Sequence, residues 1–144
     1  MSTIPLFYDG YANEDSRSSR NITSAAWVLL SPMNEFLDSW GILLGFSTNN
    51  IANYEVVITL LSRATVLGIR HLIVKVDSEL VVSQINSQYY VRNPIIYLKY
   101  LRVRLLERAF EVISYEHISR QLNVLVDSLA NCILNWHLSH QYLN

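Results

Sequence analysis

Three aspartates stand in separate segments that could bring them together at one edge of a sheet. Asp9 lies in Phe-Tyr-Asp-Gly, Asp77 in Val-Lys-Val-Asp-Ser, and Asp127 in Val-Asp-Ser-Leu-Ala. Two hard cations held about 4 Å apart can bind both the attacking water and the leaving oxygen of a phosphodiester. Because magnesium prefers oxygen ligands in octahedral geometry, such a pair needs several carboxylates converging from rigid elements. The three aspartates are therefore candidate metal ligands.

Each aspartate also has a purely structural explanation. Asp9 precedes Gly10, and Asp-Gly at the end of a strand commonly forms a turn. Asp77-Ser78 before a helix is typical of an N-cap. Asp127, in the first turn of a helix, would favour the helix dipole. The case for a metal site therefore depends on the three segments taken together, in their order along the chain.

The elements that would position these residues follow from the apolar pattern and the turn residues. Strands are predicted over residues 4–8, 24–30, 36–46, 72–76 and 110–115, and helices over 49–67, 78–86, 94–108 and 123–137. Residues 11–21 are polar and serine-rich and predict a mobile loop. The order βββαβααβα indicates an α/β fold, a five-stranded mixed sheet flanked by helices, whose first three strands form an antiparallel meander. We expect a single domain over residues 1–144.

The composition is that of a packed globule, with 51% hydrophobic and 16% charged residues. Cys132 is the only cysteine, which excludes an internal disulfide and favours a reducing, intracellular compartment, cytoplasmic or nuclear. The sequence carries neither a signal-peptide pattern nor a run of 18 apolar residues, so no membrane contact is expected. The net charge of −1 predicts weak, salt-dependent binding to any nucleic acid, through a local cluster of Lys99, Arg102, Arg104 and Arg108.

Taken in order, these segments resemble the ribonuclease H family of type 1. Two further stretches carry the resemblance: Thr-Asn-Asn-Ile-Ala-Asn-Tyr-Glu at 48–55 and His-Ile-Ser-Arg-Gln-Leu-Asn at 117–123. Within the family, the chain is most similar to the ribonuclease H domains of plant retrotransposon polyproteins and related reverse-transcriptase-like domains. The resemblance implies the ribonuclease H-like fold. It also implies metal-dependent endonucleolytic cleavage of the RNA strand of RNA–DNA hybrids.

The resemblance also implies roles for individual residues. Asp9, Asp77 and Asp127 would hold two Mg²⁺ or Mn²⁺ ions, and His117 would assist proton transfer or product release. The alternative for His117 is an exposed loop histidine. Contacts to the nucleic acid would come from the start of the first long helix and from the residue after the second aspartate, namely Thr48, Asn49, Asn50 and Ser78. Simple helix capping explains the first three equally well.

Asn53 departs from the family pattern, because the family carries glutamate at this catalytic position. Asparagine offers a neutral carbonyl on a stem shorter by about 1.5 Å, estimated from bond lengths. A charge at metal-ligand distance is worth several kcal/mol, so metal occupancy would fall by orders of magnitude. Glu55 is a poor substitute, since two helical positions turn a side chain by about 200°. Glu14 and Asp15 could supply a stray carboxylate, although a solvated loop is the simpler expectation.

Three functions stay open at this point. The first is a ribonuclease H with impaired turnover. The second is an inactive nucleic-acid-binding or scaffold domain of a retroelement polyprotein or its descendant, with a reverse transcriptase or other polyprotein domains as partners. The third is a protein-interaction domain whose contact patch is formed by Tyr89, Tyr90, Tyr97 and Tyr100, although aromatic residues at such spacing usually belong to the core. A monomer is expected for the first two.

Overall fold

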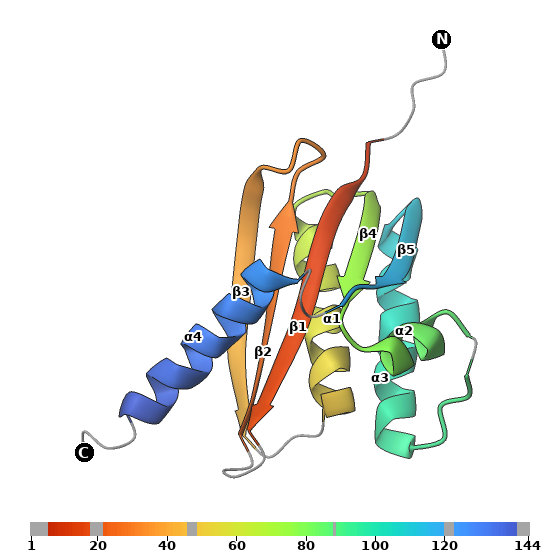
Figure 1. Ribbon diagram of the computed structural model, residues 1–144. Helices are drawn as coiled ribbons and strands as arrows, with labels where there is room; N and C mark the ends of the chain where they lie inside the picture. The colour runs from red at the N-terminus through yellow and green to blue at the C-terminus, as the bar shows by residue number, and fades with distance from the viewer. Residues whose placement is uncertain (1–5, 18–21, 46–48, 88, 120–122, 141–144) are drawn as a thin grey trace.

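The computed structural model describes residues 6–17, 22–45, 49–87, 89–119 and 123–140 (Figure 1). Its elements follow the predicted order, with one short 3-10 turn added. The strands are β1 Tyr8–Arg17, β2 Ile22–Leu30, β3 Phe36–Gly45, β4 His71–Val76 and β5 Val112–His117. The helices are α1 Asn49–Val66, α2 Glu79–Ile85, α3 Pro94–Leu106, the 3-10 turn η2 Glu107–Ala109, and α4 Val124–His140.

The five strands form one mixed sheet in the order β3-β2-β1-β4-β5. β1, β2 and β3 pair antiparallel, whereas β4 runs parallel to both β1 and β5. β1 is therefore the central strand, with the hairpin partner β2 on one side and β4 on the other. This arrangement confirms the predicted α/β class and the antiparallel meander.

Helices cover both faces of the sheet (Figure 1). In this view α4 crosses in front of β2 and β3, while α1 lies behind the sheet. The face of α1 that packs on the sheet is fully buried and includes Ala52, Val56, Val57, Leu60 and Leu61. None of the helices in the described ranges is long and apolar enough to cross a membrane.

Gly68 ends α1 as its position in the sequence predicts. Its φ is 77°, in the left-handed region that costs a side chain energy and suits glycine. The amide of Gly68 donates to Thr65 O at 3.1 Å, and that of Ile69 donates to Ala64 O at 3.0 Å. These two bonds form a Schellman motif, which satisfies carbonyls that the end of the helix would leave unpaired.

The prediction for the first strand was wrong in its bounds. β1 begins at Tyr8 and continues to Arg17, through most of the segment predicted as a mobile loop, while residues 4 and 5 lie outside the described ranges. Pairing with β2, from Asp9 with Leu30 to Arg17 with Ile22, holds this polar stretch in the ladder. Backbone hydrogen bonds therefore override a side-chain pattern without apolar alternation. Asp9 consequently lies at the start of β1 rather than at its end.

The last strand is displaced by two residues from its predicted position. The chain continues from α3 into η2, and Phe110 donates its amide to Glu107 O at 3.0 Å, so β5 begins only at Val112. His117 is therefore the last residue of β5 and not part of a loop, which corrects the sequence prediction.

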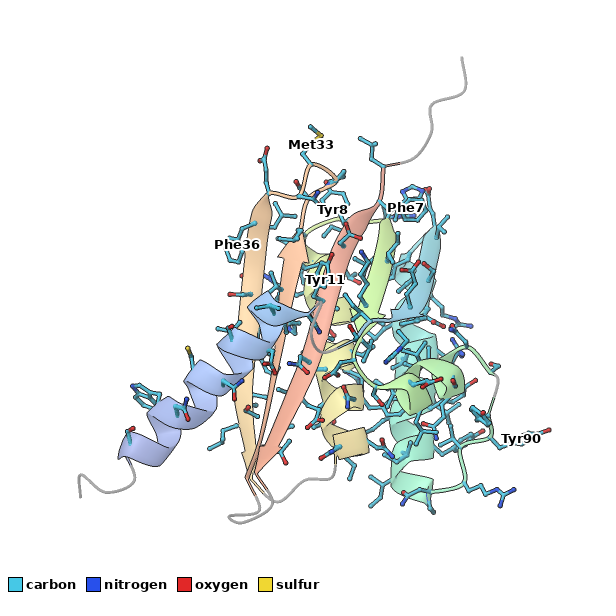
Figure 2. All side chains as sticks on the ribbon, viewed as in Figure 1. Phe7, Tyr8, Tyr11, Met33, Phe36 and Tyr90 are labelled. Atoms are coloured by element: carbon cyan, nitrogen blue, oxygen red, sulfur yellow. The ribbon has the colours of Figure 1, made fainter. Side chains whose placement is uncertain are left out.

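β3 forms one edge of the sheet and is unusually apolar for an exposed strand. Phe36, Leu37 and Ile42 expose 63%, 42% and 36% of their surface, and Figure 2 shows Phe36 at this edge. Asp38 is the only charged residue between Phe36 and Gly45, and its carboxylate accepts a hydrogen bond from Arg63 Nε at 2.6 Å. That bond holds the pKa of Asp38 below its usual range.

Candidate functional site

The parallel register of β1 and β4 fixes which residues share a level at the end of β4. Ala12 of β1 pairs with Val76 of β4, so the residues that follow this pair in the two segments are Asn13 and Asp77. Asp9 pairs with Ile73, four residues before Asp77. Four residues of strand span about 13 Å. The expectation that Asp9 and Asp77 project from the same strand end is therefore wrong, and Asn13 takes the place predicted for Asp9.

Asp9 lies beside a lysine. The distance from Lys75 Nζ to Asp9 Oδ1 is 3.5 Å, and the two side chains are only 24% and 18% exposed. Lys75 Nζ also donates to the Tyr11 hydroxyl at 3.2 Å and lies 5.0 Å from the centre of its ring. Burial works to lower the pKa of Lys75, but the Tyr11 hydroxyl and the Asp9 carboxylate outweigh it and raise that pKa above its ordinary value. A protonated ammonium group therefore supplies the positive charge at Asp9.

Asp9, Tyr11 and Asn13 share one face of β1, because alternate residues of a strand point the same way. Tyr11 packs against the buried cluster that contains Val126 of α4, so this is the α4 face. Figure 2 shows Tyr11 on β1 close to the start of α4. The Asp9-Gly10 pair lies inside the strand, which excludes the predicted turn. A Cβ on Gly10 would lie 2.8 Å from Leu60 Cδ2, so the glycine permits the close approach of α1 on the opposite face.

Asp127, in the first turn of α4, is held by side-chain amides. Asn13 Nδ2 donates to Asp127 Oδ1 at 3.0 Å, and Asn131 Nδ2 donates to Asp127 Oδ2 at 3.3 Å. Asn123 Nδ2 donates to the carbonyl oxygen of Ala12 at 3.1 Å, in a buried position. These bonds fasten the start of α4 to β1 beside the end of β4.

Asn53 is buried, with 1% of its surface exposed, in the second turn of α1. Its Nδ2 donates to Asn49 O at 2.9 Å, and its Oδ1 has no hydrogen-bond partner within the described part of the chain. The next residue, Tyr54, donates its hydroxyl to Gln84 Oε1 at 3.0 Å. Position 53 therefore presents a neutral oxygen where the family pattern has a carboxylate.

Glu14, which the sequence analysis expected in a solvated loop, is instead a buried carboxylate. It is 5% exposed and lies in β1, not in a solvated loop. Ala12 packs in the core with α1, so the alternation of the strand places Glu14 on the α1 face, opposite Asn13. If residues 11–17 had been identified as a strand from the sequence, its two-residue alternation would have placed Asn13 and Glu14 on opposite faces of the sheet.

His117 and Ser78 were also predicted to belong to the site. His117 pairs with Val76 at the carboxyl end of β5, so it shares the end of the parallel strands with Asp77. Ser78 is the N-cap of α2, and its hydroxyl accepts from the Val81 amide at 3.3 Å, which leaves Asp77 outside the capping role.

The start of α1 lies beside a small hollow. Asn49 and Asn50 are the first residues of α1, and Thr48 lies outside the described residues. Asn50 lines a hollow of about 240 Å³ together with Gln84, Arg92 and Asn93. Of the predicted nucleic-acid contacts, Asn50 therefore borders a concave surface.

Some of the charged side chains near this surface form ion pairs with one another. Glu55 pairs with Lys99 of α3, a partner that the sequence did not predict. Its helical spacing turns it about 200° from Asn53. Arg104 Nη1 contacts the Glu107 carboxylate at 2.7 Å. Arg102 and Arg108, the other members of the predicted basic cluster, are exposed.

The donor set does not fit a pair of divalent cations. No group of three or more His, Cys, Asp or Glu side chains that could hold a metal ion occurs among the residues whose placement is described. Asp9 faces an ammonium group, both oxygens of Asp127 accept amide hydrogens, and positions 13 and 53 are asparagines. Mg²⁺ dehydrates reluctantly and is usually bound through carboxylates.

The sheet order and the covering helices define an α/β domain of the ribonuclease H-like class. The family model described as "Reverse transcriptase-like" matches residues 8–133, and the chain belongs to that family. This membership confirms the resemblance drawn from the sequence.

Two relatives illustrate the similarity at sequence level. Ribonuclease HI of Halobacterium salinarum is 31% identical over 128 residues, covering 89% of this chain and 62% of the relative. A bifunctional protein of Mycobacterium tuberculosis is 36% identical over 88 residues, covering 61% of this chain and 24% of that protein. The chain thus spans less than two thirds of the length of either relative.

Solved structures agree with the fold. The crystal structure of the Halobacterium salinarum enzyme superposes with a TM-score of 0.83 at 29% identity, covering 90% of this chain and 98% of that one. The N-terminal ribonuclease H domain of the Mycobacterium tuberculosis protein gives a TM-score of 0.87 at 27% identity, covering 95% and 99%. A ribonuclease H1 solved in complex with an RNA/DNA hybrid gives 0.80 at 24% identity, covering 86% and 94%, and shows the fold alone.

Proposed function

We propose that the chain is a ribonuclease H-like domain that acts on RNA–DNA hybrids by binding them, and that it has lost most of the metal-dependent cleavage of the RNA strand. Its family membership and its similarity to ribonucleases H over nearly the whole chain support the substrate class. The observation that carries the loss is Asn53, a buried neutral amide at the position of the family's glutamate.

Binding would use the start of α1 and the end of β4. Asn49, Asn50 and Ser78 are the described residues that the resemblance assigns to the nucleic acid, and Asn50 shares its hollow with Arg92. Amide side chains suit the 2′-hydroxyl, which both donates and accepts, and this group separates RNA from DNA. With a net charge of −1, affinity would depend strongly on salt.

Cleavage in the family pattern depends on Mg²⁺ or Mn²⁺ to polarise the phosphate and activate water. Here the carboxylates that would bind these ions do not assemble into one group within the described chain. The runner-up function is a ribonuclease of low turnover, favoured by the three aspartates that the sequence retains. A role beside a reverse transcriptase, as in a polyprotein, is a further proposal that rests on the resemblance alone.

The proposal is tested by measuring binding and cleavage on the same labelled hybrid. Fluorescence anisotropy at low salt should show tighter binding to an RNA–DNA hybrid than to duplex DNA of the same sequence. Asn50→Ala should weaken binding several-fold, because a lost hydrogen bond costs about 0.5–1.5 kcal/mol. Asn34→Gly is the matched control, since Asn34 lies in the β2–β3 turn with a φ of 61° that glycine adopts freely.

Cleavage is measured with protein in excess over the hybrid, in Mg²⁺ and in Mn²⁺. We expect no metal-dependent product from the unmodified chain. Product formation that Asp127→Asn abolishes would establish the low-turnover enzyme instead. Equal, weak affinity for hybrid and duplex DNA would reject hybrid recognition itself.

A further inference from the structure

We propose that this domain replaces divalent cations with its own hydrogen-bond donors, so that its fold and its hybrid binding are independent of Mg²⁺ and Mn²⁺. The part concerning the hybrid rests on the function proposed above. The part concerning metal stands on the contacts of Asp9 and Asp127 and is tested separately.

The carboxylate of Asp127 accepts hydrogen bonds from side-chain amides of two elements. Asn13 of β1 is fully buried and donates to Oδ1, while Asn131 of α4 donates to Oδ2. The Asn13 amide must present its nitrogen to Asp127, because its carbonyl oxygen would be repelled by the carboxylate. A magnesium ion binds a carboxylate oxygen at about 2.1 Å. Each oxygen keeps a second lone pair, so an ion at Asp127 would be confined to the sides of the carboxylate that face away from the two amides.

The carboxylate of Asp9 is neutralised by an ammonium group. Lys75 lies 3.5 Å from Oδ1 and is fixed by the Tyr11 hydroxyl and ring. This lysine is only 24% exposed and sits on the strand directly beside β1. A divalent cation at Asp9 would therefore face a fixed positive charge at close range, in a region only partly screened by water.

Positions 13 and 53 explain why the remaining carboxylates do not compensate. Asn13 comes directly after Ala12, which pairs with Val76, the last residue of β4. Asn53 lies in the second turn of α1. Both side chains are buried, and both carbonyl oxygens lack a hydrogen-bond partner within the described residues. A carboxylate at position 13 would lie beside Asp127 and next to the level of Asp77, and a glutamate at position 53 would restore the residue of the family pattern. Two neutral amides thus stand at positions where a metal site would gain charge from carboxylates.

The first experiment follows thermal unfolding of the full chain at constant ionic strength, in EDTA, in 5 mM Mg²⁺ and in 5 mM Mn²⁺. We expect the unmodified chain to change Tm by less than 1 °C among the three conditions. The variant Asn13→Asp/Asn53→Glu should have a lower Tm in EDTA, because an aspartate at position 13 would lie within hydrogen-bond distance of the Asp127 carboxylate and repel it. It should then gain several degrees in Mn²⁺, because a ligand that binds only the folded state stabilises it.

The matched control adds the same two charges elsewhere. Val66 is 73% exposed near the end of α1, and Asn93 is an N-cap at which aspartate serves equally well. Val66→Glu/Asn93→Asp should show no Tm response to Mn²⁺. A rise of several degrees for the unmodified chain in Mn²⁺ would overturn the proposal, and this measurement needs no variant to fold.

The second experiment measures hybrid affinity in the same three solutions. We expect dissociation constants that agree within twofold, and a tenfold loss of affinity in EDTA would contradict the proposal. If no hybrid binds in any solution, the proposed function fails while the Tm result still decides whether metal binds.

Discussion

The two faces of β1 are built from different interactions. The α1 face is an apolar core in which Ala12, Leu60, Leu72 and Val74 are fully buried. Among the described residues, the α4 face buries Ala26, Val28 and Val126 as a separate cluster, with three half-buried apolar neighbours. The start of α4 is held instead by amides, from Asn13 to Asp127 and from Asn123 to the backbone of Ala12.

The two faces therefore contribute differently to the stability of the fold and to the positions of its polar groups. Apolar burial stabilises in proportion to area and tolerates small shifts of the partners. Hydrogen bonds contribute less, yet they require defined distances and angles. The α1 face therefore contributes most of the folding free energy, while the α4 face sets the positions of the polar groups around the end of β4.

The largest expected effect lies on the α1 face. Leu60→Ala should lower the free energy of unfolding by about 2–5 kcal/mol, because a fully buried leucine leaves a cavity against β1. Leu129→Ala, a half-buried change on the α4 face, should cost less than half as much. Urea denaturation of both variants measures the difference. Equal losses would remove the distinction between the two faces.

A smaller effect is expected from the amide that fastens α4. Asn123→Ala should destabilise by about 1–3 kcal/mol, because the buried Ala12 carbonyl loses its side-chain donor. Hydrogen exchange should accelerate in α4 before it accelerates in α1. Uniform acceleration over both helices would show that α4 is not held separately.

The smallest effect concerns the charge pair on the α4 face, since ion pairs that remain in contact with water contribute about 0–1 kcal/mol. The folded-state pKa of Lys75 is raised, chiefly by Tyr11 and Asp9 against the opposing effect of burial. Because the pKa of Lys75 is higher in the folded state, protonated Lys75 stabilises the fold in full below its unfolded-state pKa near 10.5. This stabilisation is lost as the pH rises through its folded-state pKa. Between pH 9.5 and 11.5 the unmodified chain should thus lose more stability than Lys75→Met. Parallel losses would show that Lys75 is not coupled to folding.

The fold was predictable because several local signals agreed. The apolar run at 72–76, the Asn93-Pro94 helix start and Gly68 each correspond to one element or boundary of the structure. Alternating strands and helices then limited the architecture to a mixed sheet covered by helices. Family membership agrees with this prediction.

The candidate site was less predictable, because its geometry depends on strand register. Asp9-Gly10 matched the family pattern by residue type, but β1 extends to Arg17 and carries Asp9 about 13 Å from the level of Asp77. Polar residues 11–17 give no apolar alternation, so only pairing with β2 reveals them as strand. No sequence motif marked Asn13 or Lys75 as part of the site. They become visible once the two-residue period places them on one face with Asp9 and Tyr11. The metal-ligand and catalytic roles of Asp9, Asp77, Asp127 and His117 stay predictions.

The apolar edge formed by β3 has a consequence for how the protein behaves at high concentration. A long edge strand with few charges is a template for pairing with a strand of another molecule, and soluble proteins commonly protect such edges with lysine or proline. β3 has neither residue, and its single carboxylate, Asp38, is neutralised by Arg63. Colloidal stability should therefore be limited by this edge rather than by unfolding of the core. A lysine at Ile42 should raise the concentration at which the protein precipitates and leave its Tm nearly unchanged.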